Sequence, residues 1–454
     1  MRYFLFLSLV AAACSSPGNP QQGDDQQPDA AIGHPDAPPI PPDAPPVLGT
    51  ACPTSLHEVG RITGANLHID DRGFYGPTYK QGLYTRDADG DGKADIISVE
   101  YVSGTVGAYH YQIRIFPQTA TGFGAPITSA ITFPGYGPGF NTIADVNGDH
   151  LADIIFEYQS ESPNRHEYLY VATQGANHTF TLQPSVNVSA CGSSSDERMF
   201  GFAVADVDKD GKDDVLTTVS YGGLGAAPAG VTLLKGGTSG LGSAQCMVSA
   251  SVTTHPGFPA ALVTAEAFWA DDFDGDGNLD LVAAISNKLH LFRSTGASTY
   301  EAVAGEATQP TWRVTMTDHV GGRTKQDLVN ADIHATDTTI NRFTVGSTGV
   351  VAQLLATLPQ GDTGGGYGIV RGVVAGDFNG DGLTDVFEVG NNGYSNGGSS
   401  PGTFALTCDR GSRADMSTGA VDAVSGLRAI DLDGNGTTEI AAINGSDVVI
   451  YAVQ

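Results

Sequence analysis

Basic residues are scarce in this sequence. Lysine and arginine together number 22 among 454 residues, against 50 aspartate and glutamate residues, so the formal net charge is −28. Nucleic acids and anionic membrane surfaces are bound through clustered lysine and arginine. The composition therefore excludes a phosphate-binding surface of the usual kind, and such acidity must have a use or a counterion.

Catalytic signatures are also missing. The sequence contains no G-x-S-x-G, no P-loop and no G-x-G-x-x-G after a strand, and the pairs His57-Glu58 and His166-Glu167 lack the second histidine of H-E-x-x-H. The 11 histidines are scattered without metal-ligand spacing. We therefore expect a protein that is not an enzyme.

Glycine is abundant instead, with 60 residues, and the apolar residues alternate with polar ones at a period of two. We find no amphipathic helix. These features indicate an all-β protein made of many short strands joined by glycine-rich turns.

One acidic segment recurs along the chain. It reads DADGDGKADII at Asp87, DVDKDGKDDVL at Asp206 and DFDGDGNLDLV at Asp272, with further copies at Asp145, Asp377 and Asp431. Successive copies are 54 to 66 residues apart, except for one gap of 105 residues, in which the segment between Asp318 and Asp327 fits as a decayed copy. Seven units of roughly 57 residues suit four-stranded propeller blades. We predict a seven-bladed β-propeller in which the acidic loop joins the first and second strands of each blade.

The two ends of the chain are expected to close the ring. Only two strands follow the last loop, IAAIN and DVVIYAVQ, while an unpartnered strand, SLHEVGRI, stands before the first blade. If the final blade borrows this early strand, the ring has no open sheet edge.

The acidic loops have the spacing of calcium ligands. Side chains at positions one, three, five and nine and the backbone carbonyl of position seven can surround a hard cation with oxygen, and Gly92 at position six permits the positive φ of a sharp turn. His150 replaces this glycine in the second loop. Up to six structural Ca²⁺ ions are expected, and the decayed unit should bind none. The predicted ligands are Asp87, Asp89, Asp91, Lys93, Asp95; Asp145, Asn147, Asp149, Leu151, Asp153; Asp206, Asp208, Asp210, Lys212, Asp214; Asp272, Asp274, Asp276, Asn278, Asp280; Asp377, Asn379, Asp381, Leu383, Asp385; and Asp431, Asp433, Asn435, Thr437, Glu439.

An EF-hand begins with the same pattern, but it needs a glutamate at position twelve and a helix on each side. The flanks here read as strands. Position twelve is occupied by Ser98, Phe156, Thr217, Ala283, Glu388 and Ala442. The EF-hand interpretation is therefore rejected.

The repeated D-x-[DN]-G-D-G-x-x-D loop entering an apolar strand resembles the FG-GAP or VCBS repeat of integrin α-subunit propellers and many exported bacterial proteins. The resemblance covers about residues 50 to 454. It implies a seven-bladed propeller whose calcium ions brace the loops of one face, with ligands usually bound on the other face.

The N-terminus resembles that of a bacterial lipoprotein. Residues 1–13 read as an export signal, because one basic residue precedes an apolar run too short to span a bilayer. The resemblance implies cleavage before Cys14, a lipid on its thiol, and delivery to the outer membrane or cell surface; a periplasmic or secreted protein is the alternative. Residues 14–49, rich in proline, glutamine and aspartate, should form a disordered spacer, and residues 50–454 the propeller.

Four cysteines remain, an even number in an exported protein, so two disulfides are expected. We favour Cys52 with Cys408 and Cys191 with Cys246, because each pair joins outer strands of adjacent blades. The other two pairings and free thiols stay open.

Loops on the face opposite the acidic loops are rich in glycine and tyrosine. Tyr136, Tyr221, Tyr367 and Tyr394 could stack on a sugar or hold a peptide; as an alternative, they only pack within their loops. We expect a monomeric module that binds a protein or glycan ligand. A polysaccharide lyase or hydrolase and a passive scaffold subunit of an envelope complex are the alternatives.

Overall fold

The structure of the chain is a computed structural model. It describes residues 52–65, 67, 82–105, 108–120, 122–133, 141–160, 166–192, 197–221, 229–249, 258–265, 267–274, 276–286, 288–296, 299–308, 314–316, 328–333, 337–359, 369–381, 384–391, 402–408, 413–415, 425–432 and 435–454. The predicted signal segment, Cys14, the spacer and the decayed acidic copy lie outside these residues.

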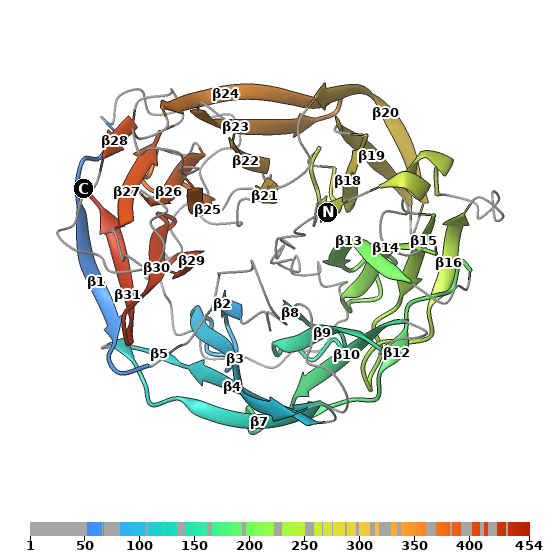
Figure 1. Cartoon of the computed structure of the whole chain (residues 1–454), viewed down its shortest axis with the longest axis horizontal. Helices are drawn as coiled ribbons and strands as arrows, with labels where there is room; N and C mark the ends of the chain where they lie inside the picture. Colours follow the sequence, from blue (N-terminus) through green and yellow to red (C-terminus); the bar gives the residue numbers. More distant parts are fainter. Residues whose placement is uncertain are drawn as a thin grey trace, which may run out of the picture.

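Antiparallel sheets are arranged in a ring, each with its first strand toward the centre and its last strand at the rim (Figure 1). Within the described residues, six sheets have four strands and one sheet has five. The four-stranded sheets are β2 (Gly82–Arg86), β3 (Asp95–Thr105), β4 (Ala108–Phe116) and β7 (Ile127–Phe133); β13 (Arg198–Ala205), β14 (Asp214–Ser220), β15 (Gly230–Leu234) and β16 (Gln245–Ser249); β17 (Ala267–Asp271), β18 (Asp280–Ile285), β19 (Lys288–Gly296) and β20 (Thr299–Thr308); β21 (Val314–Met316), β22 (Leu328–Ile333), β23 (Asp337–Gly346) and β24 (Gly349–Pro359); β25 (Ile369–Gly376), β26 (Asp385–Asn391), β27 (Gly402–Thr407) and β28 (Arg413–Asp415); and β29 (Ser425–Ile430), β30 (Glu439–Asn444), β31 (Asp447–Val453) and β1 (Leu56–Ile62).

The five-stranded sheet differs from the uniform blade that the repeat predicts. It comprises β8 (Asn141–Ala144), β9 (Asp153–Gln159), β10 (Glu167–Gln174), β11 (Phe180–Leu182) and β12 (Val186–Asn187). Both β11 and β12 pair with β10, so two short strands replace one outer strand. The prediction of seven four-stranded blades is therefore wrong: six sheets have four strands, and the outer edge of this one is interrupted.

The ends of the chain close the ring, as the unpartnered early strand predicts. Strand β1 pairs antiparallel with β31 from Leu56, opposite Val453, to Ile62, opposite Val448. Beyond the strands, the N–H of Gln454 donates to the carbonyl oxygen of Ser55 at 2.9 Å. Arg61 on β1 also forms an ion pair with Asp447 on β31, 2.6 Å between Nη1 and Oδ2. The blue and red strands lie side by side in Figure 1.

Apolar faces of neighbouring sheets form the core. On β4, Tyr111 and Ile113 are buried, whereas the residues between and beside them are more exposed, which is the alternation of a strand with one covered face. Phe133 on β7 and Phe156 on β9 pack edge to face, with ring centroids 4.8 Å apart, across two adjacent sheets. Burial between the sheets thus fixes each blade against the next.

Helix is confined, among the described residues, to a short 3-10 segment, η1 (Ala260–Thr264). No helix in the described part of the chain combines the length and hydropathy needed to cross a membrane. A small two-stranded sheet, β5 (Gln118–Thr119) with β6 (Gly122–Phe123), follows β4.

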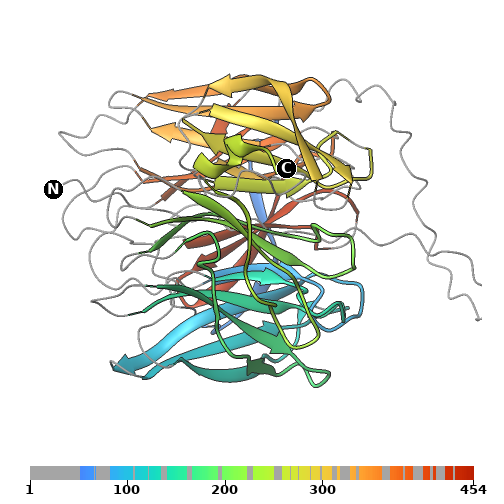
Figure 2. The same ribbon diagram turned by 90° about the vertical axis from the view of Figure 1, so that its right-hand side faces the viewer.

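The acidic loops all lie between a first and a second strand, as predicted: Asp87 follows β2, for example, and Asp95 begins β3. Since neighbouring strands are antiparallel, the second-to-third strand turns lie at the other end of each sheet. Figure 2 shows the strands running between these two faces of the ring.

Candidate functional site

The acidic loops share one backbone structure, held by the aspartate at position one. In the first loop, the N–H of Gly90 donates to Asp87 Oδ1 at 2.7 Å and that of Gly92 donates to Asp87 Oδ2 at 2.9 Å. The equivalent bond from position six recurs at Asp145, Asp206, Asp272 and Asp431, each at 2.9 Å. One carboxylate therefore folds the turn and leaves little freedom to the residues between.

The carboxylate at position nine ties the loop to the sheet. Asp95, at the start of β3, accepts the N–H of Ala88 at 2.9 Å and that of Gln118, after β4, at 2.7 Å. Asp153 and Asp280 make the same two kinds of bond. These side chains are buried, and burial raises the pKa of Asp95 to about 6 and that of Asp153 to about 7, with the neighbouring aspartates adding to the shift.

Left-handed backbone occurs at positions four and six. Gly92, Gly211 and Gly277 have φ of 83° to 84° at position six, and His150 takes the same conformation with φ of 66°. Lys209 is likewise left-handed at position four. These two residues hold a conformation that favours glycine, because a Cβ crowds the following carbonyl oxygen.

Replacing His150 with glycine is expected to stabilise the chain by about 0.5–1 kcal/mol, because the relief of left-handed strain exceeds the extra entropy of glycine in the unfolded state. Urea unfolding of the two proteins measures the difference. Gly211→His, at the equivalent position of the third loop, should lower the free energy of unfolding by a similar amount. Equal midpoints in the first comparison would contradict this account of the second loop.

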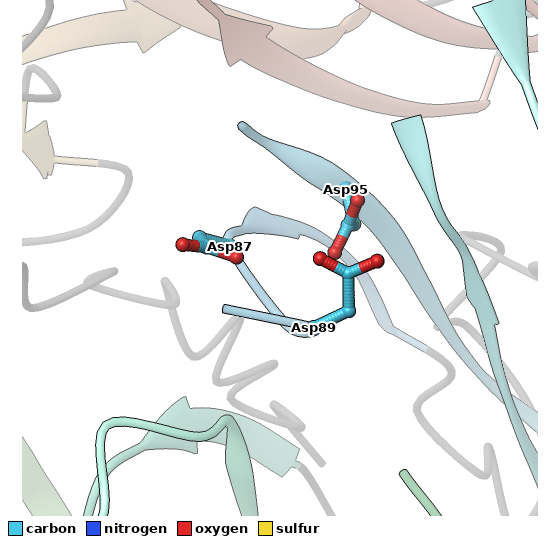
Figure 3. A group of neighbouring side chains, drawn as sticks. All are labelled: Asp87, Asp89 and Asp95. Atoms are coloured by element: carbon cyan, nitrogen blue, oxygen red, sulfur yellow. The ribbon is translucent and has the colours of Figure 1, made fainter. Parts of the chain in front are cut away.

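Three loops bring carboxylate oxygens together within 4.8 Å of one another. They are contributed by Asp87, Asp89 and Asp95, by Asp206, Asp208 and Asp210, and by Asp272, Asp274 and Asp276. In Figure 3 the carboxylates of Asp89 and Asp95 lie next to each other, and that of Asp87 stands at the entrance of the turn. Purely oxygen donors on a turn of this size fit calcium rather than zinc. In the other three loops the predicted ligands hold the same turn, but they do not form such a triplet among the described residues.

Basic side chains offset part of this charge, and two of them were not foreseen from the sequence. Lys235, after β15, pairs with Asp208 at 2.6 Å, and Arg293, on β19, pairs with Asp274 at 2.7 Å. Lys212, which we predicted only as a carbonyl donor, pairs through its ammonium with Asp210 at 2.8 Å. The third-strand residues are distant in sequence from the loop, so its spacing could not reveal them.

Neighbouring loops are also hydrogen-bonded to each other through the residue at position eight. Asp213 Oδ2 accepts the N–H of Asp145 at 2.7 Å, and the N–H of Asp213 donates to the carbonyl of Asp145 at 2.8 Å. Thr438 makes the same pair of bonds to Asp377, at 3.0 and 2.9 Å. Position eight of one loop thus fixes position one of the preceding loop.

The structure joins Cys52 to Cys408 and Cys191 to Cys246, with Cα–Cα distances of 5.9 and 4.7 Å. The first bond connects the segment before β1 to the end of β27. The second connects the segment after β12 to β16. Each therefore links two adjacent sheets near the rim.

Of the four tyrosines predicted for the ligand face, only Tyr221 lies within the described residues. Its hydroxyl accepts the N–H of Cys191 at 3.1 Å, and its ring lies over Gly192. This tyrosine therefore packs against the loop of the second disulfide, in agreement with the loop-packing alternative. Tyr136, Tyr367 and Tyr394 lie outside the described residues, as do the predicted ligands Leu383 and Asp433.

Residues 87–156 match a family model described as FG-GAP-like repeat. No curated protein matches the sequence. Among solved structures, an Agrocybe aegerita lectin whose title describes recognition of non-reducing terminal N-acetylglucosamine is 17% identical, with a TM-score of 0.46 over 80% of this chain and 88% of that chain. A protein from Lactobacillus plantarum is 12% identical, with a TM-score of 0.44 over 74% and 83% of the two chains. An exotype rhamnogalacturonan lyase is 14% identical, with a TM-score of 0.40 over 86% and 63%.

The matched residues contain the first two acidic loops, and the same loop fold recurs around the ring of sheets. The chain folds as a β-propeller, and its residues 87–156 are similar to the FG-GAP-like repeat family.

Proposed function

We propose that this propeller is a calcium-stabilised binding module that holds a protein or glycan ligand on the face opposite the acidic loops. One observation carries the proposal: the two faces of the ring are built differently. The acidic loops are fixed by hydrogen bonds to their own carboxylates and by hydrogen bonds between neighbouring loops, such as that from the Asp145 N–H to Asp213. The second-to-third strand turns do not repeat the acidic sequence, and their lengths vary from the two residues between β30 and β31 to the ten residues between β26 and β27, so their sequences are free to specify a ligand.

Calcium is proposed as the structural cofactor, bound at up to six loops. The donor set is oxygen throughout, and the carboxylates at position nine are buried beside further carboxylates. A divalent cation would favour the ionised state of these groups and remove their mutual repulsion. We further propose that the five-stranded sheet, β8 to β12, counts with the six four-stranded sheets as the seventh blade.

Arrays of immobilised glycans and of cell-envelope proteins test the binding role. The purified propeller should be retained by particular members of an array in calcium, and retention should fall in chelator as the ring loosens. Product release from the array, measured by mass spectrometry, would instead favour the lyase or hydrolase alternative. No retention and no product would leave the scaffold subunit as the remaining interpretation.

We propose that the protein is exported as a monomer and held at the outer membrane or cell surface by a lipid on Cys14. The spacer of residues 14–49 would then hold the ring away from the membrane. Cys14→Ser is expected to move the protein from the membrane fraction to the soluble fraction of the producing cells. An unchanged distribution would contradict lipid anchoring.

A further inference from the structure

The second and third acidic loops are joined by a buried pair of hydrogen bonds. Asp213, at position eight of the third loop, accepts the N–H of Asp145 through its carboxylate at 2.7 Å and donates its own N–H to the carbonyl oxygen of Asp145 at 2.8 Å. Both residues are 2% exposed, so the two bonds are shielded from water and their loss would be costly. Since Asp145 is held through its N–H and its carbonyl, its position is set by the third loop.

Gly236, which follows β15, is a second point of contact between the same two loops. Its N–H donates to Asp214 Oδ1 at 2.8 Å, and a Cβ on this residue would lie 2.6 Å from the carbonyl oxygens of both Asp213 and Val146. Val146 is position two of the second loop. Because only glycine fits between these two carbonyl groups, the backbones of the loops meet here without a side chain between them. A displacement of one loop must therefore move the other.

Asp213 stands between two predicted calcium ligands of its own loop, the carbonyl of Lys212 at position seven and the carboxylate of Asp214 at position nine. In the second loop, Asp145 is the predicted ligand at position one. Its carboxylate also shapes that turn, because it accepts the N–H of His150 at 2.9 Å. The two buried bonds thus connect the ligands of the third loop to the residue that arranges the second loop.

The second loop depends on this support more than the third. It has Asn147 at position three, so it offers three carboxylates where the third loop offers four. His150 also holds left-handed backbone at the position where the third loop has Gly211. The affinity of such a loop for calcium is set by the number of charged ligands and by the rigidity of the site. A loop with fewer charges and a strained turn therefore gains most when a neighbour fixes one of its ligands in place.

We propose that Asp213 is a positioning residue that makes the second and third loops one cooperative calcium-binding pair. The inference rests on the calcium sites of the proposed function. When the ligands of the third loop close around a cation, the segment from Lys212 to Asp214 is fixed, and Asp213 then holds Asp145 where the second loop needs it. Coupling of this kind is reciprocal, so an ordered second loop favours binding in the third by the same factor, which we expect to be about tenfold.

The residue at position eight determines which neighbouring loops are coupled in this way. Leu279 holds this position in the fourth loop, and its side chain has no polar atom that could accept the N–H of Asp206 in the third loop. The third and fourth loops touch instead at the surface, where Lys209 Nζ donates to Asn278 Oδ1. That bond does not involve the backbone of Asp206. The third and fourth loops are therefore expected to bind their ions independently of each other.

Equilibrium dialysis of the full chain against buffered free calcium, with atomic absorption of the retained ions, tests the coupling. Asp208→Ala removes the ligand at position three of the third loop, and Asp274→Ala removes its equivalent in the fourth. The variants are matched, because each aspartate is paired with a basic side chain from the third strand of its sheet or just after it. At the lowest calcium concentration that saturates the unaltered chain, Asp208→Ala should lose more than one ion, because the second loop empties in part, whereas Asp274→Ala should lose one. About tenfold more calcium should refill the second loop of Asp208→Ala.

Variants of Asp213 test the route of the coupling. Asp213→Ala removes the acceptor, and it should raise the calcium concentration that half-fills the second loop about tenfold. Asp213→Asn removes the charge but keeps an oxygen that can accept the N–H of Asp145, so calcium binding should stay close to that of the unaltered chain. In the Asp213→Ala background, Asp208→Ala should lose no more ions than Asp274→Ala.

Equal ion losses in Asp208→Ala and Asp274→Ala would overturn the proposal, and this comparison decides it even if Asp213→Ala does not fold. An Asp213→Asn chain that binds calcium as weakly as Asp213→Ala would also overturn it. So would an Asp213→Ala chain that is less stable in calcium and in chelator alike but fills its loops at an unchanged calcium concentration, because Asp213 would then only hold the fold. In these cases calcium still binds and its structural role stands; an unaltered chain that retains no ions at any concentration would remove that role itself.

Discussion

With calcium bound as we propose, its removal is expected to lower the thermal midpoint of the propeller by about 8–10 °C. A site filled at 100 times its Kd contributes about 2.7 kcal/mol to the free energy of unfolding, so three filled loops contribute about 8 kcal/mol. For a folded unit of about 400 residues, 1 kcal/mol corresponds to about 1 °C. Without the ion, the aspartates at positions three and five of each loop lose the cation that offsets their repulsion, and the buried carboxylate at position nine loses its main counter-charge. Differential scanning calorimetry in calcium and in excess chelator measures the shift.

A pair of aspartate substitutions distinguishes stabilisation by bound ions from the general electrostatic effect of removing a negative charge. Asp274 belongs to a carboxylate triplet of the fourth loop, whereas Asp318 belongs to the decayed copy, which has Val320 and Gly322 where the third and fifth ligands would be. Asp274→Ala should therefore lower the midpoint in calcium more than Asp318→Ala. In chelator the difference between the two midpoints should narrow to what the loss of the Asp274 to Arg293 ion pair and of the hydrogen bond from the Asp276 N–H to Asp274 Oδ1 costs. A midpoint that chelator does not change, or equal effects of both substitutions in calcium, would argue against structural ions.

The architecture could be predicted because the residues that fold each repeat lie close together in the sequence. In the first loop, the aspartate at position one accepts the backbone N–H groups of positions five and six. A glycine such as Gly92 supplies the left-handed backbone of the turn. The regular spacing of such loops then fixes the length of the repeat and hence the four-stranded unit. Closure by β1 followed from counting strands after the last loop, since an unpaired edge would otherwise remain.

The details that escaped prediction all depend on residues remote in sequence. Lys235 and Arg293 reach the loops from third strands, and the partner of Asp213 is 68 residues earlier in the chain. The interrupted edge of the five-stranded sheet consists of strands of three and two residues, too short for a period-two pattern to register. Glu167 was noticed only as part of an incomplete metal motif, because its burial depends on residues that are distant in the sequence.

Loss of the disulfide at the ring closure is expected to cost more stability than loss of the other disulfide. Cys52 and Cys408 are 356 residues apart in sequence, whereas Cys191 and Cys246 are 55 residues apart. In the loop-entropy model, a disulfide raises the free energy of the unfolded state by restricting its chain entropy. The longer link contributes at most about 6 kcal/mol and the shorter at most about 4 kcal/mol. The double variant Cys52→Ala with Cys408→Ala should therefore be less stable than Cys191→Ala with Cys246→Ala by about 1–2 kcal/mol in guanidinium unfolding.

The folded state adds to this difference in the same direction. Cys408 is buried in the apolar cluster that contains Phe387 and Val449, and Cys52 packs against that cluster, so the bond holds β1 at the point where the ring joins its own end. Once the bond is absent, β1 is retained by its pairing with β31 and by contacts such as Arg61 to Asp447 alone. Hydrogen exchange should then accelerate first in β1 and β31 of the Cys52 and Cys408 double variant. Uniform acceleration around the ring, or equal losses in the two double variants, would mean that the closure is held by strand pairing and not by the disulfide.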